Sequence, residues 1–249
     1  MKLIGLYDSK NKKVHVLSIT NKMEFIPTLG MINTSRFNGL NYGDEIEIFG
    51  LKFMIVRPTL FDIIGMVQKR TQTVNFKDIG KIISVMGVRG DSNVLEIGIG
   101  SGHMTISILY HLENGKLTSY DISEENIKYV KEIVEMLGFS KHWIPKLRDI
   151  KNGVEEKELD SIFVDIPEPW ISLDSLYESL KVGGILVSYI PNLTQVKEMK
   201  AKMENQGFSD INVIELIERK WAIGEMEMRP EFTGLLHTSF IVYGRRLHK

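Results

Sequence analysis

Hydrophobic and polar positions follow two different patterns along the chain, and the pattern changes near Pro58. Before Pro58, short apolar and alternating runs between turn residues predict β-strands at 2–7, 14–19, 45–49 and 51–56. After it, longer segments with apolar residues at helical spacing predict helices at 59–67, 77–87, 103–112, 123–137, 171–180 and 192–206. Apolar strands are predicted between these helices, at 93–97, 116–120, 142–147, 160–165 and 184–190.

The alternation of strands and helices after Pro58 indicates the fold class. Such alternation is typical of a parallel sheet with helices on both faces. Two final strand-like stretches, 211–221 and 237–246, have no helix between them and predict an antiparallel hairpin at the sheet edge. We therefore expect an α/β, Rossmann-like sheet of seven strands with the last one antiparallel, formed by residues 58–249. A small β-rich N-terminal domain of residues 1–57 precedes it.

Composition sets outer limits on what the protein does. The chain has 249 residues, a net charge of -1 and no cysteine. A basic field over the whole molecule and cysteine-ligated metals are therefore excluded. The first ten residues lack the apolar core of a signal peptide, and no apolar run approaches the length of a membrane helix. We expect a cytoplasmic protein with no membrane segment and no bound metal.

A glycine-rich loop follows the predicted strand at 93–97. Gly98, Gly100 and Gly102 allow the backbone to turn sharply and to approach a ligand closely, and the following helix N-terminus faces the same space. Counted from Glu96, the spacing is E-x-G-x-G-x-G, whereas a dinucleotide site requires G-x-G-x-x-G. A nicotinamide dehydrogenase is therefore disfavoured, although an ordinary strand-to-helix turn would also explain the loop taken alone.

The loop resembles motif I of the class I methyltransferases, and two carboxylates strengthen the resemblance. Asp121 ends the next strand, and Asp149 follows the third. The resemblance implies that the loop holds the methionine part of S-adenosylmethionine, Asp121 the ribose hydroxyls and Asp149 the adenine amino group. A carboxylate suits vicinal hydroxyls because it accepts two hydrogen bonds. Asp149 would equally serve to cap a turn before Asn152-Gly153.

The segment after the fourth strand carries the most specific pattern. Residues Asp165 to Trp170 read D-I-P-E-P-W and leave the carboxyl edge of the sheet, where ligands bind in open α/β folds. This segment resembles the tRNA adenine-58 N1-methyltransferase family, whose archaeal members also act at adenine 57. Four further stretches share the resemblance, namely Arg70–Ile79, Glu96–Gly102, Ser188–Val196 and His237–Val242. Together they extend it over nearly the whole chain.

The resemblance implies an activity, an assembly and a set of residues. The activity is methyl transfer from S-adenosylmethionine to N1 of an adenine in tRNA, by a homotetramer. The target base would be held by Asp165, with Tyr189 as a wall of its pocket. The cofactor contacts would be Gln72, Glu96, Gly98, Gly100, Ser101, Gly102, His103, Met104, Asp121, Asp149 and Asp165. Many relatives carry tyrosine where this chain has Asn75, so an aromatic contact to the base or cofactor is missing there.

Elementary chemistry supports a carboxylate as the base contact. N1 of adenine is a poor nucleophile, and its methylation creates a positive charge on the ring. A carboxylate hydrogen-bonded to the exocyclic amino group polarises the base, stabilises that charge and accepts a proton. The adenine is buried in folded tRNA, so the enzyme must extract it. Each basic cluster is either a solvated face or a candidate phosphate contact, and a tetramer would combine such contacts from several subunits. The clusters are Lys10, Lys12 and Lys13; Lys69 and Arg70; Lys141, Lys146 and Arg148; and Arg245, Arg246 and Lys249.

Two other functions remain open at this point. A methyltransferase for a small molecule such as a precorrin would share the glycine loop and Asp121, but would not need the segment from Asp165 to Trp170 in this form. A non-catalytic tRNA-binding subunit is the other alternative, since the eukaryotic family has a paralogue that lost its cofactor site. The complete glycine loop, Asp121 and Asp165 argue against such a loss.

Overall fold

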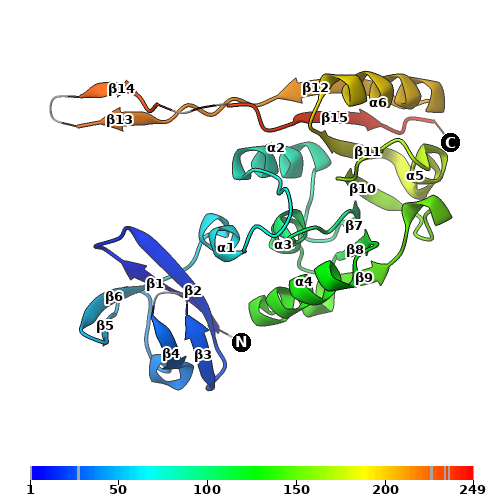
Figure 1. Ribbon diagram of the computed structural model, residues 1–249. Helices are drawn as coiled ribbons and strands as arrows, with labels where there is room; N and C mark the ends of the chain where they lie inside the picture. The colour runs from blue at the N-terminus through cyan, green and yellow to red at the C-terminus, as the bar shows by residue number, and fades with distance from the viewer. Residues whose placement is uncertain (1, 27–28, 225–226, 233, 235, 249) are drawn as a thin grey trace.

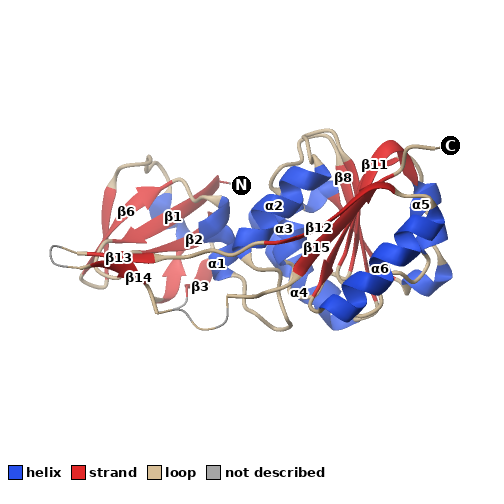
Figure 2. Cartoon of the chain, turned by 90° about the horizontal axis from the view of Figure 1, so that it is seen from above, coloured by secondary structure: helices blue, strands red, loops and turns tan. Residues whose placement is uncertain are grey.

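The computed structural model describes residues 2–26, 29–224, 227–232, 234 and 236–248. It shows a small β-rich N-terminal lobe, a larger α/β lobe, and a two-stranded arm that projects from the larger lobe (Figure 1). Seen from above, the strands of the large sheet lie between helices on both sides (Figure 2). In both views the arm and the N-terminal lobe extend to the same side of the α/β lobe.

The N-terminal lobe is a four-stranded antiparallel sheet in the order β2-β1-β6-β5, with an added hairpin. The sheet strands are β1 (Lys2–Asp8), β2 (Lys13–Ile19), β5 (Glu45–Ile48) and β6 (Leu51–Val56), as predicted. The hairpin was not predicted; it consists of β3 (Met23–Ile26) and β4 (Gly30–Asn33), followed by a 3-10 helix, η1 (Thr34–Phe37). Leu6, Phe37 and Phe53 belong to a hydrophobic core of this lobe alone.

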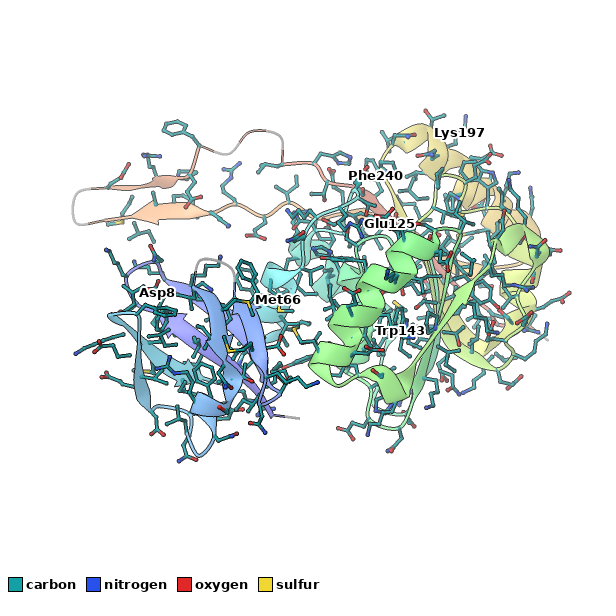
Figure 3. The ribbon with its side chains drawn as sticks, turned by 60° about the horizontal axis from the view of Figure 1, so that its bottom comes forward. Asp8, Met66, Glu125, Trp143, Lys197 and Phe240 are labelled. Atoms are coloured by element: carbon teal, nitrogen blue, oxygen red, sulfur yellow. The ribbon has the colours of Figure 1, made fainter. Side chains whose placement is uncertain are left out.

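The connection between the two lobes is short and ends in a helix cap. β6 ends at Val56, and α1 (Leu60–Met66) begins directly after Thr59. Thr59 Oγ1 accepts a hydrogen bond from Asp62 N, while Asp62 Oδ2 accepts one from Thr59 N, so the two residues form a capping box. The predicted domain boundary at residues 57 and 58 falls within this connection. Met66, at the end of α1, lies between the two lobes (Figure 3).

The α/β lobe is built on a seven-stranded sheet in the order β12-β15-β11-β10-β7-β8-β9. Its strands are β7 (Asn93–Ile97), β8 (Lys116–Asp121), β9 (Trp143–Leu147), β10 (Leu159–Val164), β11 (Leu180–Ile190), β12 (Ser209–Glu215) and β15 (Phe240–Arg245). The strands from β7 to β11 pair in parallel, whereas β15 is antiparallel to both β11 and β12. The predicted Rossmann-like sheet with an antiparallel last strand is confirmed.

Helices cover both faces of this sheet, and each predicted helix is present. One face carries α2 (Phe76–Met86), α3 (His103–Leu109) and α4 (Glu124–Leu137), and the other carries α5 (Leu173–Ser179) and α6 (Leu193–Gln206). Successive strand residues point to opposite faces, so Val94 belongs to the first core and Leu95 to the second. This two-sided burial explains the largely apolar sequences of the central strands β10 and β11. Within the described ranges, no helix is long and apolar enough to cross a membrane.

The prediction of one continuous strand at 211–221 is wrong in its bounds. β12 ends at Glu215, and β13 (Trp221–Ile223) pairs instead with β14 (Met228–Pro230) in a separate two-stranded sheet. The predicted strand is interrupted because the pairing of β12 with β15 ends at Glu215 and Phe240. Beyond this pair, the two chain segments project from the large sheet (Figure 1). The described residues between 216 and 239 form the arm, and Phe240 lies where the arm meets the α/β lobe (Figure 3).

Candidate active site

The glycine loop, residues 98–102, joins β7 to α3 and depends on glycine for two reasons. Gly98, Gly100 and Gly102 have φ angles of 92°, 52° and 82°, a region that L-residues rarely adopt. Space is equally limited, because a Cβ on Gly98 would lie 2.3 Å from the carbonyl oxygen of Asp165. A Cβ on Gly102 would lie 2.7 Å from Val130 in α4. The loop therefore approaches β10 and α4 only with glycine at these positions.

Asp121, the last residue of β8, braces the loop. Its Oδ2 accepts hydrogen bonds from the backbone N–H groups of Ile99 and Gly100, at 2.9 and 3.1 Å. Its Oδ1 accepts a hydrogen bond from Ser123 N at 2.7 Å. The same carboxylate lies on the wall of the cavity in front of the loop. Asp121 therefore shapes the loop in addition to the ligand contact predicted for it.

Glu96 lies on the buried side of the loop. Its carboxyl oxygens accept hydrogen bonds from Thr105 Oγ1, at 2.8 and 3.0 Å, and from Ser119 Oγ at 2.6 Å. Trp143 Nε1 donates to the same Ser119 Oγ at 2.9 Å, so the cluster connects β7, β8, β9 and α3. Burial raises the pKa of the Glu96 carboxyl to about 8. The structure gives Glu96 a position that supports the loop from behind, away from the three cavities described next.

A cavity of about 590 Å³ opens in front of the glycine loop, and we call it the loop cavity. This volume is within the range of small-molecule sites, roughly 300–1,000 Å³. Its wall includes several of the predicted ligand contacts, namely Gln72, Gly98, Gly100, Asp121, Asp149 and Asp165. Asp149 Oδ1 also accepts a hydrogen bond from Lys151 N at 2.9 Å and caps the 3-10 helix η3 (Ile150–Asn152). Asp149 is thus both a turn cap and a wall residue.

A much smaller cavity of about 20 Å³, the bridging cavity, lies beside the loop cavity. The two cavities share four wall residues, Gln72, Gly98, Gly100 and Asp165. The bridging cavity is also lined by Ser101, His103 and Met104. Ser101 Oγ accepts hydrogen bonds from the backbone N–H groups of Arg70 and Thr71, both at 3.0 Å. These bonds attach the segment before α2 to the glycine loop.

A third cavity of about 440 Å³ lies between α1 and the root of the arm, and we call it the arm-root cavity. Its wall includes Phe61, Lys69, Phe76, Tyr189, His237 and Thr238. Gln72 lies on the walls of all three cavities, and His103 lies on two of them. The two predicted catalytic residues are on different walls: Asp165 borders the loop and bridging cavities, and Tyr189 borders the arm-root cavity.

Asp165 presents an unneutralised carboxylate at the junction of the cavities. Its backbone N–H donates to the carbonyl oxygen of Ile97 at 2.9 Å, which fixes it beside β7. Within the part of the chain that the structure describes, no side chain donates a hydrogen bond to its carboxylate. Burial raises the pKa of this carboxyl to about 7. A buried acid without a partner favours a ligand that brings positive charge or hydrogen-bond donors.

His103, the first residue of α3, is an uncharged ring between two cavities. Burial lowers the pKa of its imidazole to about 4, and the charge of Lys69 acts in the same direction. Its Nδ1 is buried and has no hydrogen-bond partner among the described residues. Because the ring stays neutral at physiological pH, it does not repel a cationic ligand in the bridging cavity.

Several wall residues were missed by sequence analysis. Phe61 and Thr71 contribute to the cavities, but no local pattern marks them. Asn75 did carry a usable signal, because an asparagine three positions before an acidic residue is typical of a helix N-terminus. In the structure Asn75 Oδ1 accepts a hydrogen bond from Lys77 N at 3.1 Å and caps α2. The cap gives this short polar side chain a structural role where the resembling family carries tyrosine.

We expect Gly98→Ala to weaken the binding of S-adenosylmethionine about tenfold, because the added methyl would collide with Asp165 and strain the backbone by about 1–3 kcal/mol. Isothermal titration calorimetry measures this change. Gly80→Ala is the matched control, since a Cβ at Gly80 in α2 meets nothing within 4 Å. It should leave the affinity unchanged and raise the free energy of unfolding by about 0.5–1 kcal/mol. Equal affinities in the two variants would contradict the steric requirement at Gly98.

Relatives of known activity match most of the chain. Residues 52–237 match the model of a family described as the tRNA methyltransferase complex GCD14 subunit. The tRNA (adenine(57)-N(1)/adenine(58)-N(1))-methyltransferase TrmI of Methanocaldococcus jannaschii is 30% identical, over 96% of this chain and 93% of that protein. The tRNA (adenine(58)-N(1))-methyltransferase TrmI of Thermus thermophilus is also 30% identical, over 79% of this chain and 78% of its own.

Solved structures agree with these matches. A SAM-dependent O-methyltransferase of Thermotoga maritima superposes with a TM-score of 0.82 at 27% identity, covering 100% of this chain and 94% of that one. The tRNA (m1A58) methyltransferase TrmI of Aquifex aeolicus gives a TM-score of 0.76 at 24% identity, covering 100% and 98%. A precorrin 8w decarboxylase reaches 0.60 at 15% identity over 70% of this chain and 92% of its own, which shows a shared fold alone. The resemblance predicted from the sequence is confirmed, and the chain belongs to the tRNA methyltransferase family that includes the TrmI adenine-N1 enzymes.

Proposed function

We propose that this protein transfers the methyl group of S-adenosylmethionine to N1 of adenine 58 in tRNA. The observation that carries the proposal is the partly buried, unpaired carboxylate of Asp165, on the wall shared by the loop and bridging cavities. The bridging cavity shares Gln72 and His103 with the arm-root cavity, which is large enough for a nucleobase. The choice of tRNA, of N1 and of position 58 comes from the named relatives, and the archaeal relative adds position 57.

The loop cavity suits S-adenosylmethionine in both volume and polarity. We assign the methionine part to the glycine loop with Ser101, His103 and Met104, the ribose to Asp121 and the adenine to Asp149. Glycine at position 98 lets the loop lie directly against the backbone of Asp165, on the wall of the same cavity. When bound, the cofactor supplies an electrophilic methyl group on a cationic sulfur. Glu96 contributes by holding the loop from behind.

The arm-root cavity suits the target base. Its aromatic wall residues Phe61, Phe76 and Tyr189 can stack on a base that has been taken out of the folded RNA. As the ring acquires positive charge, the carboxylate of Asp165 accepts a hydrogen bond from the exocyclic amino group and stabilises that charge. The bridging cavity, at about 20 Å³, holds only about one water. Gln72, on the walls of all three cavities, must therefore move aside when base and donor meet.

RNA reaches this cavity from the side to which the arm and the N-terminal lobe extend (Figures 1 and 2). Lys69 lies on the cavity wall, and Lys10, Lys12 and Lys13 lie in or beside the turn between β1 and β2. These positions are too few for strong phosphate binding by a chain whose net charge is -1. We therefore assign the active form to a homotetramer, which combines basic positions from several subunits. Since its substrate is tRNA, we place the enzyme in the cytoplasm.

The direct test is nucleoside mass spectrometry of unmodified tRNA after incubation with the protein and S-adenosylmethionine. We expect 1-methyladenosine, mapped by fragment analysis to position 58. Methylation of position 57 as well would match the archaeal relative, and tRNA with guanine at both positions is the control. A protein that binds S-adenosylmethionine but leaves tRNA unmodified would refute the proposed substrate. Absence of binding would refute the assignment of the loop cavity.

Asp165→Asn should lower kcat by about 100-fold or more while leaving the affinity for S-adenosylmethionine nearly unchanged, because only the charge on the base depends on the carboxylate. Burial raises the pKa of Asp165 to about 7, so the carboxylate is lost as the pH falls through that value. For the wild type, kcat/KM should therefore rise with pH up to about 7 and then level off. The variant should lack this rise. Identical pH profiles for the two proteins would remove Asp165 from the mechanism.

The assembly has its own test. The arm exposes apolar side chains that a subunit contact would cover, since Trp221, Met228 and Phe232 are 55%, 81% and 93% exposed. Multi-angle light scattering should give about four times the mass of the 28.5 kDa chain. Replacing Trp221 and Met228 by serine should shift the mass towards that of smaller species. A monomeric wild type with full activity would contradict the tetramer.

A further inference from the structure

Asp78 is a fully buried carboxylate that the proposed reaction does not use. It lies in the first turn of α2, and its Oδ1 accepts a hydrogen bond from Lys77 Nζ at 2.8 Å. Its Oδ2 accepts hydrogen bonds from the hydroxyl groups of Tyr189, at 2.8 Å, and Thr238, at 2.7 Å. Burying a carboxylate is costly unless it is paired and hydrogen-bonded, and here both conditions are met. Both hydroxyl donors come from the wall of the arm-root cavity.

Lys77 neutralises Asp78 and connects it to the arm. Besides the bond to Asp78, its Nζ donates to Leu216 O at 2.8 Å and to Thr238 Oγ1 at 2.7 Å. All three donors of the ammonium group therefore have acceptors. Leu216 is the first residue of the arm and Thr238 is close to its last, so one side chain joins the two segments that connect the arm to the large sheet.

The start of α2 fixes this pair in space. Asn75 caps the helix, which places Lys77 and Asp78 in its first turn, next to β11 and β15. Negative charge is favoured at a helix N-terminus, so the helix itself stabilises the Asp78 carboxylate. A capping residue with a lysine two positions and an aspartate three positions after it thus produces a charge-balanced anchor for neighbouring hydroxyl groups.

We propose that Lys77 and Asp78 are positioning residues for Tyr189: they fix its phenol to the arm root, so that the ring keeps its place when a base enters the arm-root cavity. The inference rests on the proposed function, which assigns that cavity to the base. Neither residue lies on the wall of the loop, bridging or arm-root cavity, so both act through Tyr189. Burial, assisted by Asp78, raises the pKa of Tyr189 to about 12, so its hydroxyl remains a donor at physiological pH.

A double-mutant cycle on kcat separates this role from a general contribution to folding. Tyr189→Phe removes only the hydroxyl, and Asp78→Asn keeps the size of the side chain but cannot satisfy three donors. We expect Asp78→Asn to lower kcat for tRNA methylation about tenfold in the wild-type background, and less than about twofold in the Tyr189→Phe background. The second factor is small because the bond to the phenol is already absent. The same factor in both backgrounds would overturn the proposal.

Asp62→Asn is the matched control. Asp62 is also in the first turn of a helix, α1, where it bonds to Thr59, but it is exposed and has no contact with Tyr189. This variant should lower the melting temperature and leave kcat unchanged. Asp78→Asn should keep the affinity for S-adenosylmethionine, because the pair is remote from the loop cavity. Loss of that affinity in proportion to kcat would show a general loss of structure and would overturn the positioning role.

A second readout does not depend on activity. The protein is labelled with 3-fluorotyrosine and its fluorine NMR spectrum is recorded. The signal that is absent from the spectrum of Tyr189→Phe is that of Tyr189. We expect this signal to broaden or divide in Asp78→Asn, and to stay sharp in Asp62→Asn. If Asp78→Asn fails to fold, Thr238→Val removes one hydroxyl of the same network and should give a smaller broadening. An unchanged Tyr189 signal overturns the proposal, whereas a wild type inactive on tRNA refutes the proposed function and leaves this test valid.

Discussion

The close approach of β7 and β10 at their carboxyl ends determines where every other part of the site can lie. A side chain at Gly98 would come within 2.3 Å of the backbone of Asp165, and Asp165 N donates to the carbonyl oxygen of Ile97. Because these two strands are neighbours in a parallel sheet, the loop after one and the acid after the other meet at the same edge. Backbone pairing therefore brings the proposed donor site and the base-binding carboxylate together.

Glu96, Asp78 and Asp165 differ in how the protein compensates their carboxyl groups. Glu96 accepts hydrogen bonds from hydroxyl groups, and burial raises its pKa to about 8, which favours the uncharged form near neutral pH. Asp78 forms an ion pair with Lys77. Among the described residues, the carboxyl group of Asp165 has neither a hydroxyl donor nor a cationic partner, and burial raises its pKa to about 7. Asp165, which the fold leaves uncompensated, lies on the wall of both the loop and the bridging cavities, where a base that becomes cationic would supply the missing charge.

The strands and helices of the α/β lobe could be predicted because both faces of the sheet are covered by helices. Successive strand positions such as Val94 and Leu95 are therefore apolar, since each packs into one of the two cores. Strand-end positions such as Asp165 followed from topology. The β3–β4 hairpin could not be predicted, since its strands have four residues each and Phe25 is 69% exposed. The end of β12 was also invisible, because the alternating pattern continues after its pairing with β15 has ended. The bond between Asp78 and Tyr189 joins elements far apart in the chain, and no local spacing predicts it.

The arm leaves the sheet at the wall of the cavity that we assign to the base, and this coincidence has a mechanical consequence. Lys77 joins the two chain segments at the root of the arm, and its ion-pair partner Asp78 is hydrogen-bonded to Tyr189. Whatever orders the arm also restricts these hydrogen-bonded groups, and through them the ring on the cavity wall. A subunit contact that covers the exposed apolar side chains of the arm would thus pre-organise the base pocket. Assembly and base binding would then depend on one set of buried hydrogen bonds.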